Sequence, residues 1–208
     1  MRQTENALIA ALSALFLLSG ACALVYQIAW QRILFAAFGS DLESITIIVS
    51  AFMLGLGAGA LTGGALADRL PRQALALFAL AEGGIGLFAL CSPTLFRWAG
   101  EMTVAASLPV IAGVNFALVL IPTLLMGASL PILVTDVSRR WRNIGRSTGQ
   151  LYAVNTLGAA LGALLAGFVL FYWLTLDEAI RLAALGNFIV ALATLALVKA
   201  AEGARTCN

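Results

Sequence analysis

The sequence predicts an all-α fold, a polytopic membrane helical bundle of about six transmembrane helices that forms a single domain over residues 1–208. The first observation is composition: 62% of the residues are hydrophobic and only 11% are charged, whereas a soluble domain carries about 25% charged residues. The second is length, because a bilayer core requires about 20 apolar residues per helix. Six stretches meet this requirement: 7–35, 43–66, 73–92, 104–135, 148–173 and 179–199.

The fourth stretch contains Pro109, Pro122 and Pro131, so we expect kinks in it whose freed carbonyls are covered by neighbouring helices. Tryptophans lie near the predicted helix ends, as expected of residues at a membrane interface. They are Trp30, Trp98, Trp141 and Trp173.

The distribution of basic residues predicts the orientation, since cytoplasmic loops are enriched in Lys and Arg. With the N-terminus inside, three of the twelve basic residues fall outside: Arg32, Arg97 and Arg181. The inner segments hold the other nine: Arg2, Arg69, Arg72, Arg139, Arg140, Arg142, Arg146, Lys199 and Arg205. We therefore expect both termini on the cytoplasmic side of the membrane.

Composition also restricts the chemistry. The chain contains no histidine, and its three cysteines lie far apart, so we expect neither a metal site nor a disulfide framework. A net charge of +2 provides no surface for nucleic acid. No cofactor is expected.

Glycines at four-residue spacing mark faces where another backbone can approach closely. These faces serve either packing within the chain or a sliding or dimerising contact, and the sequence does not separate the two. The helix-packing residues are Gly55, Gly59 and Gly63 in the second stretch, and Gly158 and Gly162 in the fifth.

Polar side chains inside the spans are costly and need an explanation. We predict a polar membrane lining with Glu82 at mid-depth, where its carboxylate binds a cation, relays protons or locks helices together. Interhelical hydrogen bonds that only fix packing are the alternative. The other members are Gln27, Asn115 and Asn187 in the outer half and Asn155 in the inner half.

Two cytoplasmic segments carry further charged candidates. Asp68, Arg69 and Arg72 are a candidate gate or static clasp, in which Asp68 caps the next helix or pairs with an arginine of the loop near residue 140. The second segment, 138–147, is a candidate docking surface, although topology control beside acidic lipid explains it equally well. Its basic residues are Arg139, Arg140, Arg142 and Arg146.

Four segments together resemble the membrane region of bacterial proteins in which transmembrane helices are fused to a spermidine-synthase-like domain. They are SGACALVYQIAWQR (19–32), AFMLGLGAGALTGGALADR (51–69), PTLLMGASLPIL (122–133) and LYAVNTLGAALGALLAGFVL (151–170). Gln27 stands where many members carry Glu. That membrane region is similar to one half of a major facilitator transporter, and the loop 64–72 resembles the loop between that superfamily's second and third helices. The resemblance implies a six-helix half-transporter bundle in a bacterial inner membrane.

The chain contains no strand, glycine-rich loop and helix unit of the kind that the family's synthase-like domain would supply, so we expect it not to be an enzyme. Two functions remain. One is a non-catalytic membrane module that anchors or accompanies a separately encoded synthase-like protein or a larger membrane complex. The other is a half-transporter that works as a dimer, with a cationic amine such as a polyamine as its substrate. The family association suggests that substrate.

Overall fold

The computed structural model is all-helical, and six of its helical segments are long and apolar enough to cross a membrane, which confirms the predicted number of spans. It describes the backbone of residues 2–38 and 41–206 and the side chains of residues 6–36 and 42–200. The first four spans are α1 (Arg2–Phe38), α2 (Asp41–Arg69), α3 (Ala74–Met102) and α4 (Leu108–Trp141). The fifth consists of α5 (Ile144–Leu165), a π-helical turn (Ala166–Leu170) and α6 (Phe171–Trp173), and the sixth is α7 (Leu176–Thr206).

The prolines account for two differences from the predicted boundaries. Helix α3 continues to Met102, ten residues beyond the predicted end at 92, with Pro93 buried inside it. Pro109 lies in the first turn of α4, where its missing N–H would have no partner, so the expected kink there is wrong. Pro122 and Pro131 do lie inside α4. Next to Pro122, the Thr123 hydroxyl donates a hydrogen bond to the carbonyl oxygen of Val119 in the same helix, at a distance of 3.0 Å.

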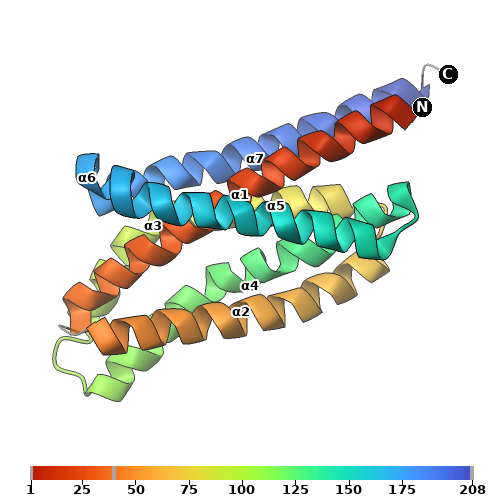
Figure 1. Ribbon diagram of the computed structural model, residues 1–208. Helices are drawn as coiled ribbons and strands as arrows, with labels where there is room; N and C mark the ends of the chain where they lie inside the picture. Colours follow the sequence, from red (N-terminus) through yellow and green to blue (C-terminus); the bar gives the residue numbers. More distant parts are fainter. Residues whose placement is uncertain (1, 39–40, 207–208) are drawn as a thin grey trace.

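Helices far apart in the sequence make the most extensive contacts. Helix α2 packs along α4, α1 packs along α5, and α3 packs along α7. Figure 1 shows the α2–α4 pair along one edge of the bundle and α1 beside α7 at the other, with α5 in front. Helix α1 begins and α7 ends at the same end of the bundle, as an even number of spans requires.

The pattern of helix contacts stays the same when each of the first three spans exchanges places with the corresponding one of the last three, α1 with α4, α2 with α5 and α3 with α7. The α1–α5 contact then becomes α4–α2, the α1–α7 contact becomes α4–α3, and the α3–α7 contact is unchanged. Because successive spans cross in opposite directions, the two triplets run in opposite senses. The bundle therefore has the contact pattern of an inverted repeat.

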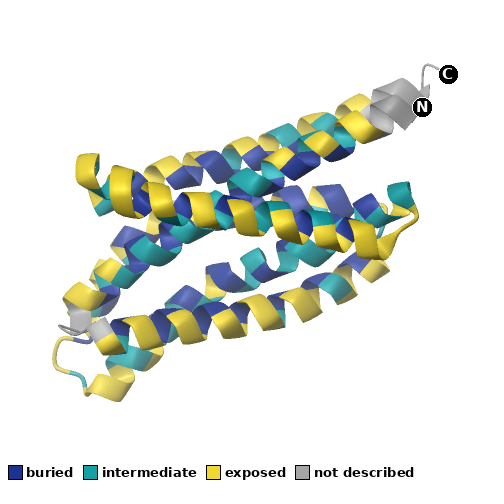
Figure 2. Ribbon diagram, viewed as in Figure 1, coloured by how far each residue is buried: buried dark blue, intermediate teal, exposed yellow. Residues whose placement is uncertain are grey.

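The core lies between the helices, and the outward faces are apolar. Figure 2 shows buried residues on the inner faces and exposed residues along the outer surfaces. Large exposed hydrophobic side chains include Leu61, Leu80, Phe168 and Leu192. A surface of this kind suits a lipid environment.

One of the predicted interfacial tryptophans lies in the core. Trp30 is 0% exposed, because its ring packs among aromatic side chains of α2 and α3 instead of facing outward. Its prediction as an interfacial residue is wrong. Trp98 and Trp173 are exposed, at 57% and 77%.

Candidate functional site: a buried carboxylate beside a polar pocket

A hydrogen-bonded network joins three helices around the carboxylate of Glu82, which is 0% exposed. The Ser19 hydroxyl of α1 donates to Oε1 at 2.8 Å. The Asn187 Nδ2 of α7 donates to Oε2 at 2.7 Å. The Tyr26 hydroxyl, two turns after Ser19 on α1, donates to Asn187 Oδ1 at 2.7 Å. Both carboxylate oxygens therefore accept hydrogen bonds from neutral donors.

Small residues allow these helices to approach closely enough for the network to form. Gly86 lies one turn after Glu82 on α3, and a methyl group there would come within 3.3 Å of the Asn187 Cβ. On α7, a methyl group at Gly186 would lie 2.5 Å from the Cys22 sulfur of α1. Glycine at both positions keeps α7 near enough to α3 and α1 for Asn187 to contact Glu82 and Tyr26.

An aromatic cluster lies beside the network. The Trp30 ring stacks on Tyr26 with centroids 5.3 Å apart, and its Nε1 donates to the Ser92 hydroxyl at 2.9 Å. Phe52 and Phe88 pack against the same indole. These rings hold Tyr26 in place and separate the network from that end of α1.

The carboxylate has no cationic partner among the described side chains. The two ion pairs found there join Arg97 to Asp177 and Arg140 to Asp136. Arg32, the basic residue of α1 nearest the network in sequence, lies over the Phe171 ring at 4.8 Å. Buried carboxylates are normally paired with a cation or neutralised, and the described side chains offer Glu82 hydrogen bonds but no counter-charge.

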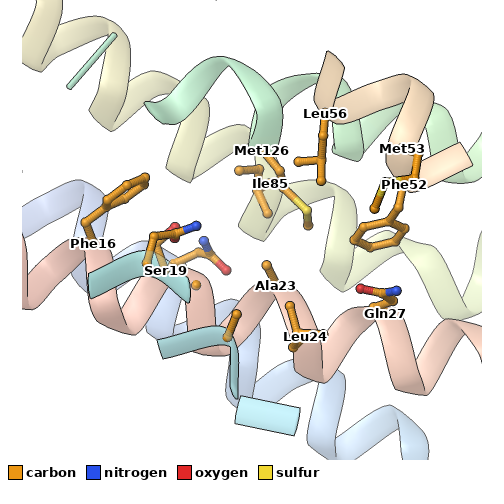
Figure 3. Close-up of a pocket in the computed structure, with 14 residues that line it drawn as sticks. Phe16, Ser19, Ala23, Leu24, Gln27, Phe52, Met53, Leu56, Ile85 and Met126 are labelled. Carbon is orange, nitrogen blue, oxygen red and sulfur yellow. The ribbon is translucent and has the colours of Figure 1, made fainter. Parts of the chain in front are cut away.

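A pocket of about 110 Å³ lies next to the network, between the α1–α5 pair and the α2–α4 pair. Figure 3 shows Ser19 and Gln27 of α1 with Phe52, Met53 and Leu56 of α2 around it. Four of its lining residues are polar, namely Ser19, Gln27, Asn155 and Asn187. Ser19 and Asn187 both contact Glu82, so they connect the pocket to the carboxylate.

Gln27 and Asn155 contribute amides that remain available. Neither side chain makes a hydrogen bond to another described residue. Asn155 reaches the pocket because α1 carries Gly20 opposite it, where a methyl group would lie 2.7 Å from the Asn155 Oδ1. A bound molecule could therefore use both amides without breaking a bond within the protein.

The structure brings most of the predicted polar lining together. Gln27, Asn155 and Asn187 line one pocket, and Glu82 lies directly behind it. Asn115 is separate: it is 3% exposed, its Nδ2 donates 2.9 Å to the Ile111 carbonyl of its own helix, and it does not line the pocket. A partner four residues away satisfies that amide locally. The functional role of the lining stays a prediction.

The predicted packing glycines lie between helices of this chain. A methyl group at Gly55, Gly59 or Gly63 of α2 would meet α4, at Thr123, Leu124 and Ala128 respectively. The α5 glycines face α1 in the same way, Gly158 against Leu17 and Gly162 against Ala21. These glycines set the distances within the two helix pairs that border the pocket.

Among the described residues, Asp68 makes neither of the contacts predicted for the candidate gate or clasp, and the gating role of Asp68, Arg69 and Arg72 stays a prediction. Asp68, Arg69 and Arg72 are exposed, and among the described residues Asp68 makes neither an ion pair nor a hydrogen bond. Gln73 precedes α3 at the N-cap position, without a side-chain cap. An exposed ion pair gains little because water and salt screen it, so nothing holds Asp68 against an arginine.

The arginines of the predicted docking surface are in three different situations. Arg140 pairs with Asp136, with its Nε 2.6 Å from the carboxylate. Arg146 lies over the Trp141 ring at 4.4 Å. Arg139, Arg142 and Arg146 are exposed, and Arg142 adopts a left-handed conformation (φ 54°) that ends α4. Of these three, Arg139 and Arg142 make neither an ion pair nor a ring contact with a described residue, so their charges are the most accessible.

The comparisons with known proteins give three curated relatives. A protein of Streptomyces coelicolor named polyamine aminopropyltransferase 1 is 28% identical over 162 residues, which is 77% of this chain and 29% of that protein. The polyamine aminopropyltransferase of Corynebacterium efficiens is 29% identical over 180 residues, 83% and 32% respectively. Polyamine aminopropyltransferase 2 of S. coelicolor is 30% identical over 156 residues, 72% and 27%. No protein-family model matches the chain, nor does any solved structure match it significantly.

These relatives agree with the resemblance to spermidine-synthase-like proteins and contradict one prediction. The expectation that the chain is not an enzyme is overturned, because proteins that match 72–83% of it are named as enzymes. The chain spans about a third or less of the length of these relatives. A missing catalytic motif in these 208 residues was therefore not sufficient ground for that expectation.

Proposed function

We propose that the six-helix bundle is the membrane-embedded part of a polyamine aminopropyltransferase system and holds its transferase unit at the cytoplasmic face of a bacterial membrane. The observation that carries the proposal is the extent of the matches. They cover 72–83% of this chain but only 27–32% of each relative. The proposal assigns the membrane part to the matched segment and aminopropyl transfer to the remaining two thirds.

The bundle provides one surface suited to this role. In the proposed orientation, Arg139 and Arg142 project from the α4–α5 connection into the cytoplasm. Both are exposed, whereas the neighbouring Arg140 is partly buried and bonded to Asp136. An acidic face of the transferase unit would complement them, since opposite charges guide docking and fix its register.

Affinity purification in mild detergent tests the anchoring role. The native chain, tagged and expressed in its source cell, should retain aminopropyl-transfer activity through the purification. Exchanging Arg139 and Arg142 together for glutamine should reduce the retained activity. Arg181→Gln on exposed α7 is the matched control and should retain it. An absence of transfer activity in the purified native material would contradict the proposal.

A second candidate function, a half-transporter that works as a dimer, has separate support. The helix contacts follow an inverted repeat, the organisation of major facilitator halves and of several other transporters. A polar pocket also lies between the two helix pairs. Uptake of a substrate into liposomes that contain the purified chain would support this candidate. A chain that remains monomeric in the membrane would exclude it.

A further inference from the structure

We propose that the pocket beside Glu82 binds a small primary alkylammonium ion, with its charged nitrogen toward Ser19 and Asn155. The inference deepens the second candidate function by naming a substrate class, and it rests on that function for its biological role. Binding itself can be measured without transport, so the two can fail separately.

The sign of the ligand's charge follows from Glu82. The residue is completely buried, and both of its oxygens accept hydrogen bonds from uncharged side chains. No ion pair with Glu82 exists in the described part of the chain. A monovalent cation in the adjoining pocket would supply the missing charge at short range, where the low dielectric constant of the interior strengthens the attraction.

The chemistry of the wall favours an ammonium group. An alkylammonium nitrogen has three N–H donors, and the Ser19 end of the pocket is lined by two side chains with acceptor oxygens, Ser19 and Asn155. Gln27 lies two turns further along α1, roughly 12 Å away, where it can contact another part of a guest. The Gln27 and Asn155 amides have no protein partner within the described residues. Ser19 donates its own proton to Glu82, which leaves its lone pairs free to accept a hydrogen bond from the ligand.

The rest of the wall distinguishes an organic cation from a metal ion. Glu82 itself does not line the pocket, so its oxygens do not face a guest directly. A hard metal ion would lack the direct carboxylate ligands that it prefers. The remaining lining is largely apolar and suits a short alkyl chain. Its larger apolar side chains are Phe16, Phe52, Met53, Leu56, Ile85 and Met126.

The size of the pocket limits the ligand. A water molecule occupies about 30 Å³ in the liquid, so 110 Å³ corresponds to roughly four non-hydrogen atoms. The n-butylammonium ion, with one atom more, is at the upper limit of this size and has the required charged head and apolar body. Its neutral counterpart, 1-butanol, has nearly the same shape and no charge, so the pair isolates the contribution of the charge.

Thermal unfolding of the purified chain in detergent, with n-butylammonium or 1-butanol added, tests the proposal. We expect n-butylammonium to raise the unfolding midpoint and 1-butanol at equal concentration to leave it unchanged. Glu82→Gln should weaken the apparent affinity roughly tenfold or more, because it removes the charge and keeps the shape. Glu101→Gln, the same exchange at an exposed position of the same helix, should bind like the native chain.

Asn155→Leu provides a second variant if Glu82→Gln does not fold, and it should also weaken binding. Equal stabilisation by the alcohol and the ammonium ion would overturn the proposal, as would binding that survives both Glu82→Gln and Asn155→Leu. A native chain that does not respond to n-butylammonium would overturn it as well. Binding without uptake into liposomes would support the proposed binding site and contradict only the proposed transport function.

Discussion

The contact between α2 and α4 leads to a sharp prediction, because two glycines of α2 that are two residues apart should respond to the same substitution with opposite signs. A methyl group at Gly59 would lie 2.9 Å from the Leu124 carbonyl carbon and 3.0 Å from the Gly127 Cα. At Gly57 a methyl group would meet nothing within 4 Å. We therefore compare Gly59→Ala with Gly57→Ala.

The magnitude follows from the distances. Carbon atoms in contact prefer a separation of about 3.5–4.0 Å, and the atoms opposite Gly59 are backbone atoms that cannot rotate away. The Leu124 carbonyl oxygen lies closer still, so the helices must separate by about 1 Å or more, which removes roughly half or more of the dispersion energy at the contact. We expect Gly59→Ala to destabilise the bundle by about 1–3 kcal/mol. Gly57→Ala should stabilise it by up to about 1 kcal/mol through helix propensity.

Both variants would be unfolded thermally in the same detergent micelles and followed by far-ultraviolet circular dichroism. The native chain should melt between them, with Gly59→Ala below it and Gly57→Ala at or above it. Equal midpoints for the two variants would refute the α2–α4 contact described above. A lower midpoint for Gly57→Ala than for Gly59→Ala would refute it too and would indicate that the other face of α2 is the packed one.

Three further predictions concern the network and the cytoplasmic end. Tyr26→Phe removes the donor to Asn187 and should lower stability by about 0.6 kcal/mol and by no more than about 1.7 kcal/mol, the average and the maximum measured for hydrogen bonds between membrane helices. An unchanged melting midpoint would contradict the bond. Asp136→Asn breaks the pair with Arg140 and should cost about 0.3–0.5 kcal/mol, a loss that should shrink in high salt if the pair is electrostatic. Arg142→Cys, in a chain without its native cysteines, should react with a membrane-impermeant maleimide only after the cells are opened; labelling of intact cells would reverse the orientation.

The number of spans, and the need of Glu82 for polar partners, could be predicted from sequence. Each depends on the free energy of placing a few neighbouring residues in the membrane, which the local sequence determines. Twenty apolar residues in a row have few alternatives to crossing a bilayer. A carboxylate among them requires partners wherever it lies. Glycine spacing likewise identified helix faces that contact other backbones, although it did not say which helices they contact.

The partners of Glu82 could not be predicted in the same way. Ser19 and Tyr26 are common in membrane helices, and only the packing of α1 against α3 and α7 brings them to the network. Trp30 was assigned to the membrane interface because it lies near the end of a predicted span. The structure extends α1 to Phe38 and places Trp30 in the core.

Asn115 and Asp68 show that a polar residue predicted to make a long-range contact can do without one. The side chain of Asn115 finds a carbonyl one turn away, and Asp68 remains in an exposed position without a partner among the described residues. Local satisfaction and hydration remove the reason for a long-range contact in both cases. Sequence patterns indicate that a polar group requires a partner, but they do not indicate how near that partner is.

The pairing of α1 with α5, α2 with α4 and α3 with α7 also determines when the protein can assemble during synthesis. A ribosome that has released only the first three helices has produced segments whose main partners do not yet exist. Until α4, α5 and α7 are inserted, the first three helices lie in the lipid without these partners, and the faces that will contact them remain exposed. Assembly is therefore a late event, and a chain interrupted after α3 would present these faces to the quality-control proteases of the membrane.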